Sequence, residues 1–277
     1  MKLIAFDLDG TLLNAEKLLT PENEAALRRA AETGIELVPA TGRFYGAIPE
    51  NVRSLPYIHY AITINGAQIW DVRRACSLSR AEIPLARALE VMEYLDGLPV
   101  IYDCYMDDWG WISRAHYDQA EDFTPNRHSL EMLKKMRTPV PDLKRHLRAV
   151  GHDVQKVMTF FRDPELRLAT MRELAERFPD LAVTSSIPRN AELNSLEAQK
   201  GRALERLAAA LGVELSQTVA FGDDLNDVSM LRAAGIGVAM ENACPEARAA
   251  ADLVTASCEQ SGVARALETL LFSSELS

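Results

Sequence analysis

Short apolar runs alternate with helical stretches in the first and last thirds of the chain, and this alternation limits the possible folds more than any other feature. The runs are compact, as expected of strands buried on both faces of a parallel sheet. They lie at 3–6, 35–40, 60–64, 218–221, 236–240 and 253–255. Helical stretches lie beside them at 21–34, 200–211, 228–234, 245–251 and 262–271. This order predicts βαβ units and therefore an α/β, Rossmann-like domain with a parallel sheet.

The middle of the chain follows a different pattern. Its strands lengthen and alternate, and Asp107-Asp108 separates runs at 100–105 and 109–113, which predicts a hairpin. A further strand at 154–161, a helix at 165–178 and a second hairpin turning at 188–190 follow. Hairpins separated by helices predict an inserted α+β domain. We therefore expect a core domain from 1–82 and 190–277 and an inserted domain at 83–189.

Composition narrows the possible partners and compartment. The formal net charge is −10 over 277 residues, which argues against nucleic acid or an anionic membrane surface as a partner. The four cysteines are scattered without the paired spacing of a zinc site, which fits a reducing compartment. No apolar run approaches the length of a membrane-spanning helix, and the N-terminal run is too short for a signal peptide. We expect a cytoplasmic protein.

Two carboxylates follow the first apolar run directly. Asp7 and Asp9 are two residues apart, so in a strand they would leave on the same side, and Gly10 lets the backbone turn sharply. The carboxyl ends of parallel strands are where open α/β sheets bind ligands. The motif alone fits an ordinary acidic turn equally well. A calcium-binding EF-hand loop is excluded because its third acid, its glycine at position six and its glutamate at position twelve are missing.

Polar residues also follow the second and third runs. Thr41, Gly42 and Arg43 offer a hydroxyl, a backbone amide and a guanidinium in succession, a set that can bind phosphate oxygens. Asn65 and Gly66 form a turn dipeptide whose simplest interpretation is structural.

The last third carries a lysine and an acidic cluster. Lys200 stands near the start of a helix, where an anion shared with the helix N-terminus would favour it, although a solvated surface lysine is the commoner case. Asp223, Asp224, Asn226 and Asp227 directly follow a predicted strand. Their mutual repulsion would be relieved by a bound cation, and oxygen ligands of this kind suit Mg²⁺.

Taken in order, these motifs resemble those of the haloacid dehalogenase-like (HAD) hydrolase superfamily. The resemblance is carried by the stretches 7–11, 41–43 and 222–227 and by Lys200. The long insertion together with Asn65-Gly66 looks like the type IIB cap of the Cof-like phosphatases. One stretch departs from the family's pattern, because Glu197-Ala-Gln-Lys200 stands where relatives often have Gly-Val-Ser before the lysine. We expect this loop to be more helical, with Ser195 as a candidate N-cap.

The resemblance implies a Mg²⁺-dependent phosphatase that works through an aspartyl-phosphate. Asp7 would be the nucleophile and a metal ligand. Asp9 would be the general acid and base, with its backbone carbonyl on the metal. Asp223 would be the remaining carboxylate ligand, supported by Asp224 or Asp227.

The resemblance also implies how the substrate is held. The residues that would hold the transferring phosphate are Thr41, Gly42, Lys200, Asn226 and the amide of Leu8. Arg43 and Asn65 would face the cap and the leaving group. In the cap, Tyr105, Trp109 and Arg189 are candidate substrate contacts.

The expected substrate is a small phosphorylated metabolite, sugar phosphates above all, and a monomer or weak homodimer would suffice to bind it. Two alternatives stay open. One is a phosphosugar mutase, which would share the same core site. The other is a non-catalytic protein that binds a phosphorylated ligand, because a fold alone does not establish activity.

Overall fold

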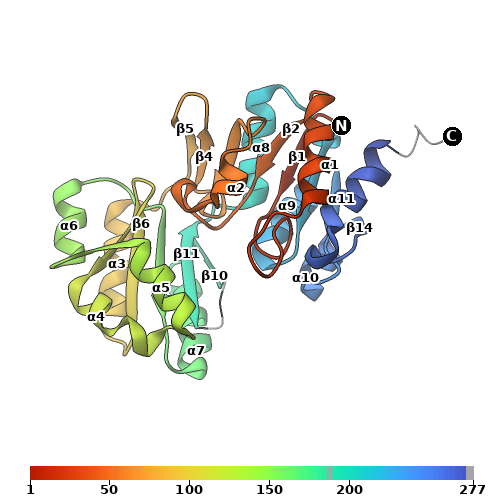
Figure 1. Cartoon of the computed structure of the whole chain (residues 1–277). Coiled ribbons are helices and arrows are strands. Elements are labelled where there is room, and N and C mark those ends of the chain that lie inside the picture. The colour runs from red at the N-terminus through yellow and green to blue at the C-terminus, as the bar shows by residue number, and fades with distance from the viewer. Residues whose placement is uncertain (186, 188, 273–277) are drawn as a thin grey trace. The chain divides into compact units, whose positions relative to one another are not determined.

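The computed structural model describes residues 1–185, 187 and 189–272, and the chain forms two compact units. The first comprises Met1–Arg80 and the chain from Gln199 onward, and the second is Ala81–Ala198. Figure 1 shows both units and labels many of their helices and strands. No helix within the described residues combines the length and the apolar character needed to cross a membrane.

The first unit is built on a five-stranded sheet whose order is β14-β13-β12-β1-β2, with every pair of neighbours parallel. Its strands are β1 (Leu3–Phe6), β2 (Glu36–Pro39), β12 (Thr218–Gly222), β13 (Ile236–Ala239) and β14 (Leu253–Val254). Strand β1, which lies between β12 and β2, is fully buried along its length, as its unbroken apolar sequence predicts. The predicted α/β class is therefore confirmed.

Helices connect these strands and cover the sheet. Their bounds are α1 (Pro21–Glu32), α2 (Glu50–Arg53), α8 (Lys200–Leu211), α9 (Val228–Ala233), α10 (Pro245–Ala250) and α11 (Gly262–Leu267). The start of α1 follows its local sequence, because the Thr20 side chain accepts a hydrogen bond from the Asn23 amide and Pro21 is the first helical residue. The start of α8 differs from expectation. Gln199 is its N-cap, whereas Ser195 belongs to a preceding strand and does not cap the helix.

The third apolar run does not simply extend the parallel sheet. It forms β3 (Tyr60–Thr63), which pairs antiparallel with β4 (Gln68–Asp71), and β4 pairs antiparallel with β5 (Cys76–Arg80). Isolated parallel bridges, such as Ala40 with Ile62, still join β3 to the chain after β2. The turn after Thr63 returns the chain at once as a hairpin, so no crossover helix follows β3.

The second unit is α+β, as predicted. Its six-stranded sheet has the order β10-β11-β9-β6-β7-β8, antiparallel except for the parallel pair β7 and β8. Its strands are β6 (Ile101–Met106), β7 (Trp109–Ser113), β8 (Arg137–Val140), β9 (Lys156–Phe160), β10 (Leu181–Thr184) and β11 (Asn190–Ser195). Its helices are α3 (Leu85–Leu95), α4 (Arg114–Phe123), α5 (Arg127–Lys135), α6 (Leu143–Val150) and α7 (Pro164–Arg177).

The hairpin predicted at Asp107-Asp108 is confirmed. Both residues have positive φ, 56° and 58°, as a two-residue turn between twisted strands requires. The second hairpin also forms, since β10 pairs with β11, although Pro188 in its predicted turn lies outside the described residues. Because β11 also pairs with β9, the compact units divide at Ala198/Gln199, whereas the sequence placed that boundary at 189/190.

Candidate active site

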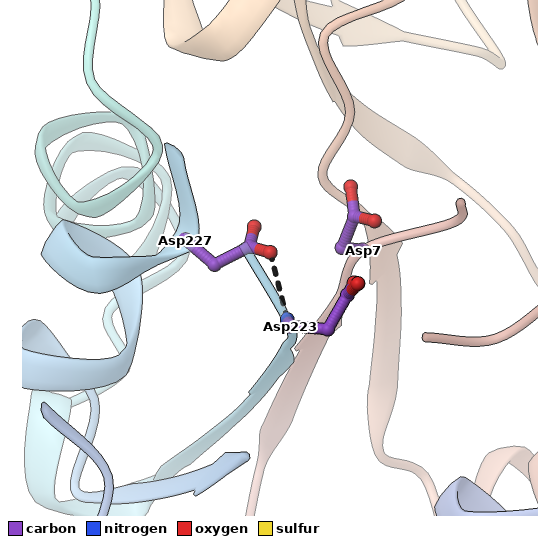
Figure 2. Close-up of side chains that lie close together, drawn as sticks. All are labelled: Asp7, Asp223 and Asp227. Carbon is purple, nitrogen blue, oxygen red and sulfur yellow. Dashed lines mark hydrogen bonds between the residues drawn. The ribbon is translucent and has the colours of Figure 1, made fainter. Parts of the chain in front are cut away.

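The carboxyl edge of the parallel sheet carries the candidate site. Asp7 follows β1 and Asp223 follows β12, and these two strands are direct neighbours in register. The Asp7 amide donates to the carbonyl of Phe221 at 3.0 Å, so the pairing continues up to the first carboxylate. Figure 2 shows the side chain of Asp223 directed toward Asp7, with Asp227 beside them. Two segments far apart in sequence thus place their acids together, as the motif order predicts.

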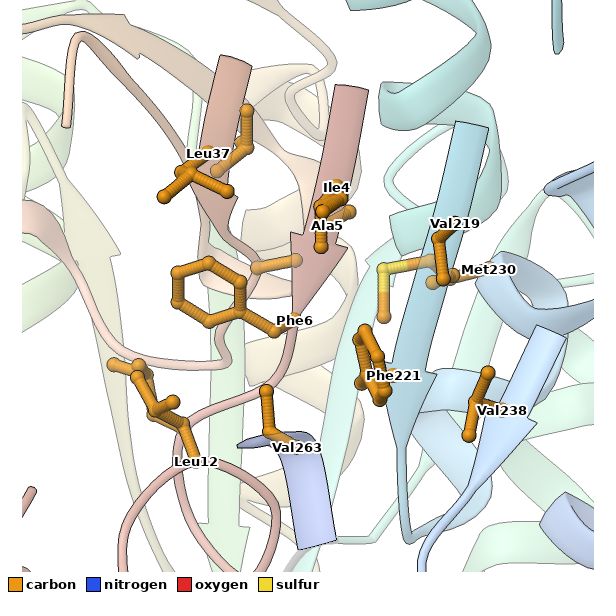
Figure 3. Packing of buried hydrophobic residues seen from close by; sticks show 14 of the residues in the cluster. Ile4, Ala5, Phe6, Leu12, Leu37, Val219, Phe221, Met230, Val238 and Val263 are labelled. Carbon is orange, nitrogen blue, oxygen red and sulfur yellow. The ribbon is translucent and has the colours of Figure 1, made fainter. Parts of the chain in front are cut away.

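The strands beneath these carboxylates are fixed by a continuous apolar core. Figure 3 shows Phe6 from β1 and Phe221 from β12 among buried side chains of the neighbouring strands, with Met230 and Val263 packed against them. Phe6 and Phe221 are both 0 % exposed. A fully buried side chain of this size stabilises the fold by about 1.5–3 kcal/mol, so the positions of Asp7 and Asp223 are held by rigid elements.

Lys200 joins two of the acids. Its Nζ donates to Asp7 Oδ1 at 2.6 Å and to Asp227 Oδ1 at 2.6 Å, and both Lys200 and Asp227 are fully buried. Burial acts to lower the pKa of Lys200, but the charges of Asp227 and Asp7 outweigh it and raise that pKa above its ordinary value. Lys200 is therefore positively charged. Its complete burial excludes the commoner case of a solvated surface lysine.

Asp227 orders the loop that carries Asp223. Its Oδ2 accepts the backbone N–H groups of Asp223 at 2.9 Å and Asp224 at 3.1 Å, and the first of these bonds is the dashed line in Figure 2. Since Oδ1 is bonded to Lys200, both oxygens of Asp227 already accept hydrogen bonds. Asp224 lies on the surface and caps the short turn by accepting the amide of Leu225.

The pKa values of the other two acids are raised. Burial raises the pKa of Asp7 well above its ordinary value, and the charge of Lys200 offsets this only in part. Burial also raises the pKa of Asp223 to about 7, and the charge of Asp227 adds to this rise. The hydrogen bond that Asp223 accepts from Thr11 Oγ1 at 2.7 Å acts to lower the pKa. Both shifts come first from burial, which disfavours the ionised carboxylates, and the neighbouring acids add to it.

The donor set fits a divalent cation. Among the described residues, carboxylate oxygens of Asp7, Asp223 and Asp227 lie within 4.8 Å of one another, with one lysine charge against three acids. Gly10 adds room beside them: its φ is +88°, and a Cβ at this position would collide with Asp223 Oδ2. Hard oxygen donors with excess negative charge are the ligands that Mg²⁺ prefers.

Asp9 is held elsewhere. The Arg43 guanidinium donates from Nε to Asp9 Oδ2 and from Nη2 to Asp9 Oδ1, both at 2.7 Å, and Lys17 Nζ lies 2.9 Å from Oδ1. Burial acts to raise the pKa of Asp9, but Arg43 and then Lys17 lower it to about 2. Because β1 ends at Phe6, strand alternation does not extend to Asp9, and its carboxylate has different partners from that of Asp7.

The residues predicted to bind phosphate lie on adjoining loops. Thr41 is 1 % exposed, and its Oγ1 accepts the amide of Arg43 at 3.2 Å. Asn65 donates its backbone N–H to the carbonyl of Thr41 at 3.0 Å, and its Oδ1 accepts from Asn226 Nδ2 at 3.2 Å. Gly42 lies between Thr41 and Arg43 in the same loop. Asn65 thus joins the loop at 41–43 to the acidic loop, a connection that its turn sequence does not reveal.

Leu8, whose amide was predicted to hold phosphate, is fully buried between Asp7 and Asp9 in the chain.

Lys17 was not identified from the sequence, because a lone lysine in a loop gives no signal of an ion pair. Thr11 stood within the quoted motif without an assigned partner, and its bond to Asp223 appears only in the folded chain.

The second unit contains the three candidate cap contacts. Tyr105 is 6 % exposed, and the guanidinium of Arg137 lies 4.5 Å from its ring centroid. Trp109 is 38 % exposed, and its Nε1 donates to Thr138 Oγ1 at 2.8 Å. Arg189 Nη1 donates to the carbonyl of Thr124 at 3.4 Å. A role in substrate binding stays a prediction for all three.

Comparison with known proteins agrees with this geometry. The haloacid dehalogenase-like hydrolase family matches residues 4–267. The chain is 32 % identical over 269 residues to the 5-amino-6-(5-phospho-D-ribitylamino)uracil phosphatase YcsE of Bacillus subtilis, covering 96 % of this chain and 94 % of that protein. It is 33 % identical over 301 residues to the phosphatase YwpJ of the same organism, covering 98 % and 100 %.

A solved structure of a haloacid dehalogenase-like hydrolase from B. subtilis superimposes with a TM-score of 0.82 at 33 % identity, covering 98 % of this chain and 100 % of that one. A parallel sheet with paired acids at its carboxyl edge and an inserted α+β unit defines a hydrolase of this type. The chain belongs to the haloacid dehalogenase-like hydrolase family. The resemblance drawn from the sequence motifs is thereby confirmed.

Proposed function

We propose that this protein is a Mg²⁺-dependent phosphatase that hydrolyses small phosphorylated metabolites through an aspartyl-phosphate on Asp7. The observation that carries the proposal is the contact of Asp7 with Lys200, beside Asp223, at the edge of the parallel sheet. Family membership supports the reaction class, and the named substrate of the B. subtilis relative, a phosphorylated ribitylamino compound, supports a small sugar-like leaving group.

Asp7 is the proposed nucleophile because it is a carboxylate on a rigid strand end with a cation beside it. Its Oδ1 is bonded to Lys200, which leaves Oδ2 to attack phosphorus. Attack forms the bond from Asp7 Oδ2 to phosphorus and breaks the bond from phosphorus to the ester oxygen. A carboxylate and a phosphate ester repel one another, and the charge of Lys200 reduces that repulsion.

The cation would be held by the carboxylates of Asp7 and Asp223 and by the backbone carbonyl of Asp9. When bound, Mg²⁺ would neutralise negative charge on the nucleophile and on the phosphoryl oxygens. Asp227 positions this set rather than adding a ligand, because its oxygens already accept from Lys200 and from two backbone amides. Asp224 is too exposed for the same task and caps the turn.

Asp9 is the proposed general acid and base. As an acid it gives its proton to the leaving alkoxide. As a base it then takes a proton from the water that attacks the phosphorus of the aspartyl-phosphate, releasing phosphate and restoring the Asp7 carboxylate. Its bonds to Arg43 and Lys17 favour the ionised form, so proton donation requires Asp9 to leave these partners. Arg43 is then free to contact the leaving group.

The phosphoryl oxygens are proposed to be held by Thr41, Gly42, Lys200, Asn226 and the amide of Leu8. Asn65 holds Thr41 and Asn226 in place through its hydrogen bonds to both residues. All these residues belong to the first compact unit, so the site needs no residue of the cap for the phosphoryl group itself. The cap residues Tyr105, Trp109 and Arg189 are proposed to contact the leaving group.

The test is a screen for release of inorganic phosphate from a panel of phosphorylated metabolites, with and without Mg²⁺. We expect release with Mg²⁺, none after chelation with EDTA, and none from the Asp7→Asn variant, whose circular dichroism spectrum should match that of the wild type. Isomerisation of a hexose phosphate without release would instead identify a mutase. Binding of phosphorylated compounds without either reaction would identify a ligand-binding protein.

A further inference from the structure

The turn between β3 and β4 has an unusual backbone. Ile64, Asn65 and Gly66 have φ values of 52°, 57° and 98°, so three successive residues adopt the left-handed region. Asparagine and glycine tolerate this region, but a β-branched isoleucine rarely does. Ile64 is also fully buried. A strained conformation of this kind persists only where surrounding contacts fix it, and such positions concentrate at functional sites.

One side of this turn is bonded to the loop at 41–43. The Ile64 amide donates to the carbonyl of Arg43 at 2.9 Å, and the Asn65 amide donates to the carbonyl of Thr41 at 3.0 Å. The Asn65 side chain then receives a hydrogen bond from Asn226. Asn65 is 7 % exposed, so its amide group has little freedom to take another position.

Helix α8 holds the other side of the turn. Gly66 packs against the backbone of Gln199 so closely that a Cβ at position 66 would lie 2.5 Å from the Gln199 carbonyl oxygen. Farther along the same helix, Arg206 Nη2 donates to the carbonyl of Gly66 at 2.9 Å. The helix that begins with Lys200 therefore also fixes the turn that carries Asn65.

We propose that Arg206 is a positioning residue for the phosphate site, acting through the Gly66 carbonyl to hold Asn65 between the 41–43 loop and Asn226. Without this bond the turn loses a contact on the helix side, and the left-handed backbone relaxes toward an unstrained conformation. Asn65 then no longer bridges the two loops. The inference rests on the proposed function for its catalytic readout, while phosphate binding tests it independently of turnover.

The test compares Arg206→Met, Arg206→Lys and the control Arg202→Met, with Mg²⁺ present. Arg202 lies on the same helix, is largely exposed and pairs with Glu205 on the surface. We expect Arg206→Met to weaken binding of inorganic phosphate, measured by calorimetry, by about tenfold, the size expected for the loss of one hydrogen bond. Arg206→Lys, which keeps a donor, should recover part of the affinity, and Arg202→Met should match the wild type.

A double-mutant cycle shows whether Arg206 acts through Asn65. Asn65→Gly removes the side chain and keeps a residue that tolerates positive φ. In that background we expect Arg206→Met to cause no further loss of phosphate affinity. On an aryl phosphate, Arg206→Met should raise KM and leave the pH dependence of kcat unchanged, because the proposal has Arg206 act through the Gly66 carbonyl and not on Asp7 or Asp9.

Three results would overturn the inference: wild-type phosphate affinity in Arg206→Met, losses that add fully to those of Asn65→Gly, or a lysine variant as weak as the methionine variant. These outcomes are separable from failure of the proposed function. A wild-type protein that binds phosphate but releases none from any ester would refute the phosphatase, and the calorimetric comparison would still decide the role of Arg206.

Discussion

The guanidinium of Arg43 donates to both carboxylate oxygens of Asp9, each at 2.7 Å, in a two-point contact that Lys17 reinforces. The sequence predicted that Arg43 would face the leaving group, and it predicted Asp9 as the acid and base. The structure joins these two residues in one ion pair. Under the proposed function, substrate that draws Arg43 toward the leaving group would release Asp9 to donate its proton, so the pair would couple substrate binding to the acid step.

The Arg43–Asp9 pair should make stability depend on pH at the acid end. The pKa of Asp9 is about 2 in the folded chain and about 4 when unfolded, so its ionised form stabilises the fold above pH 4. That contribution is lost as the pH falls through about 2. We expect the difference in unfolding free energy between wild type and Arg43→Met to be largest above pH 4 and to shrink toward pH 2, in urea titrations.

The control for this experiment is Arg53→Met. Arg53 forms a surface pair with Glu50 within a short helix, and such exposed pairs contribute about 0–1 kcal/mol. Arg53→Met should therefore change the unfolding free energy little at every pH of the titration. A difference for Arg43→Met that grows on acidification would contradict the assignment.

Removing the charge of Asp227 should destabilise the protein strongly. Asp227→Asn keeps an oxygen that can accept the backbone amides. It leaves the fully buried Lys200 with Asp7 as its remaining acidic partner among the described residues. Breaking one partner of a buried ion pair costs about 3–5 kcal/mol, and we expect a loss in this range by urea unfolding. Asp224→Asn in the same loop should change stability little, because asparagine caps a helix turn as well as aspartate does. Equal effects of the two substitutions would argue against the buried pair.

Mg²⁺ should raise the melting temperature of the wild type. A ligand that binds only the folded state stabilises it, by about 2.7 kcal/mol at one hundred times its dissociation constant. We expect this shift to be lost in Asp223→Asn and retained in Asp224→Asn, as measured by calorimetric melting with Mg²⁺ or EDTA. A shift that survives in Asp223→Asn would place the metal elsewhere.

Without metal, Asp223 should make the fold less stable as the pH rises. Its pKa is about 7 in the folded chain and about 4 when unfolded, so between these values the folded state binds more protons. Stability relative to Asp223→Asn should therefore fall from pH 4 to pH 7 in EDTA. Saturating Mg²⁺, which favours the ionised carboxylate, should remove this slope. A wild type that gains stability relative to the variant over this range in EDTA would refute the raised pKa.

Much of the fold follows from local signals in the sequence. The runs that became β1 and β12 are apolar along their length, and acids follow each at once, so their meeting at one sheet edge was predictable. The hairpin at Asp107-Asp108 was also predictable, because aspartates between two strand-like runs suit a turn with positive φ. In each case a short segment contains the information that determines its structure.

Other features depend on partners far along the chain. Strand β8 begins with a charged residue and contains a proline, both of which argue against a strand. It forms because Arg137 has a partner far along the chain: its buried Nε lies 2.8 Å from Asp103 Oδ2. The partner of Asp9 could not be inferred either, since no periodicity links positions 9 and 43. Tertiary contacts decide these features, and local propensity does not report them.

The account depends most directly on Asp7 as the group that receives the phosphate. An acid-quenched reaction of Asp9→Asn with an aryl phosphate, whose leaving group departs without a proton from Asp9, tests this claim after digestion and mass spectrometry. The account predicts a phosphoryl group on the peptide that contains Asp7, because this variant lacks the base that activates water, and it predicts no adduct in Asp7→Asn. Continued phosphate release by Asp7→Asn, or an adduct on another residue, would contradict it.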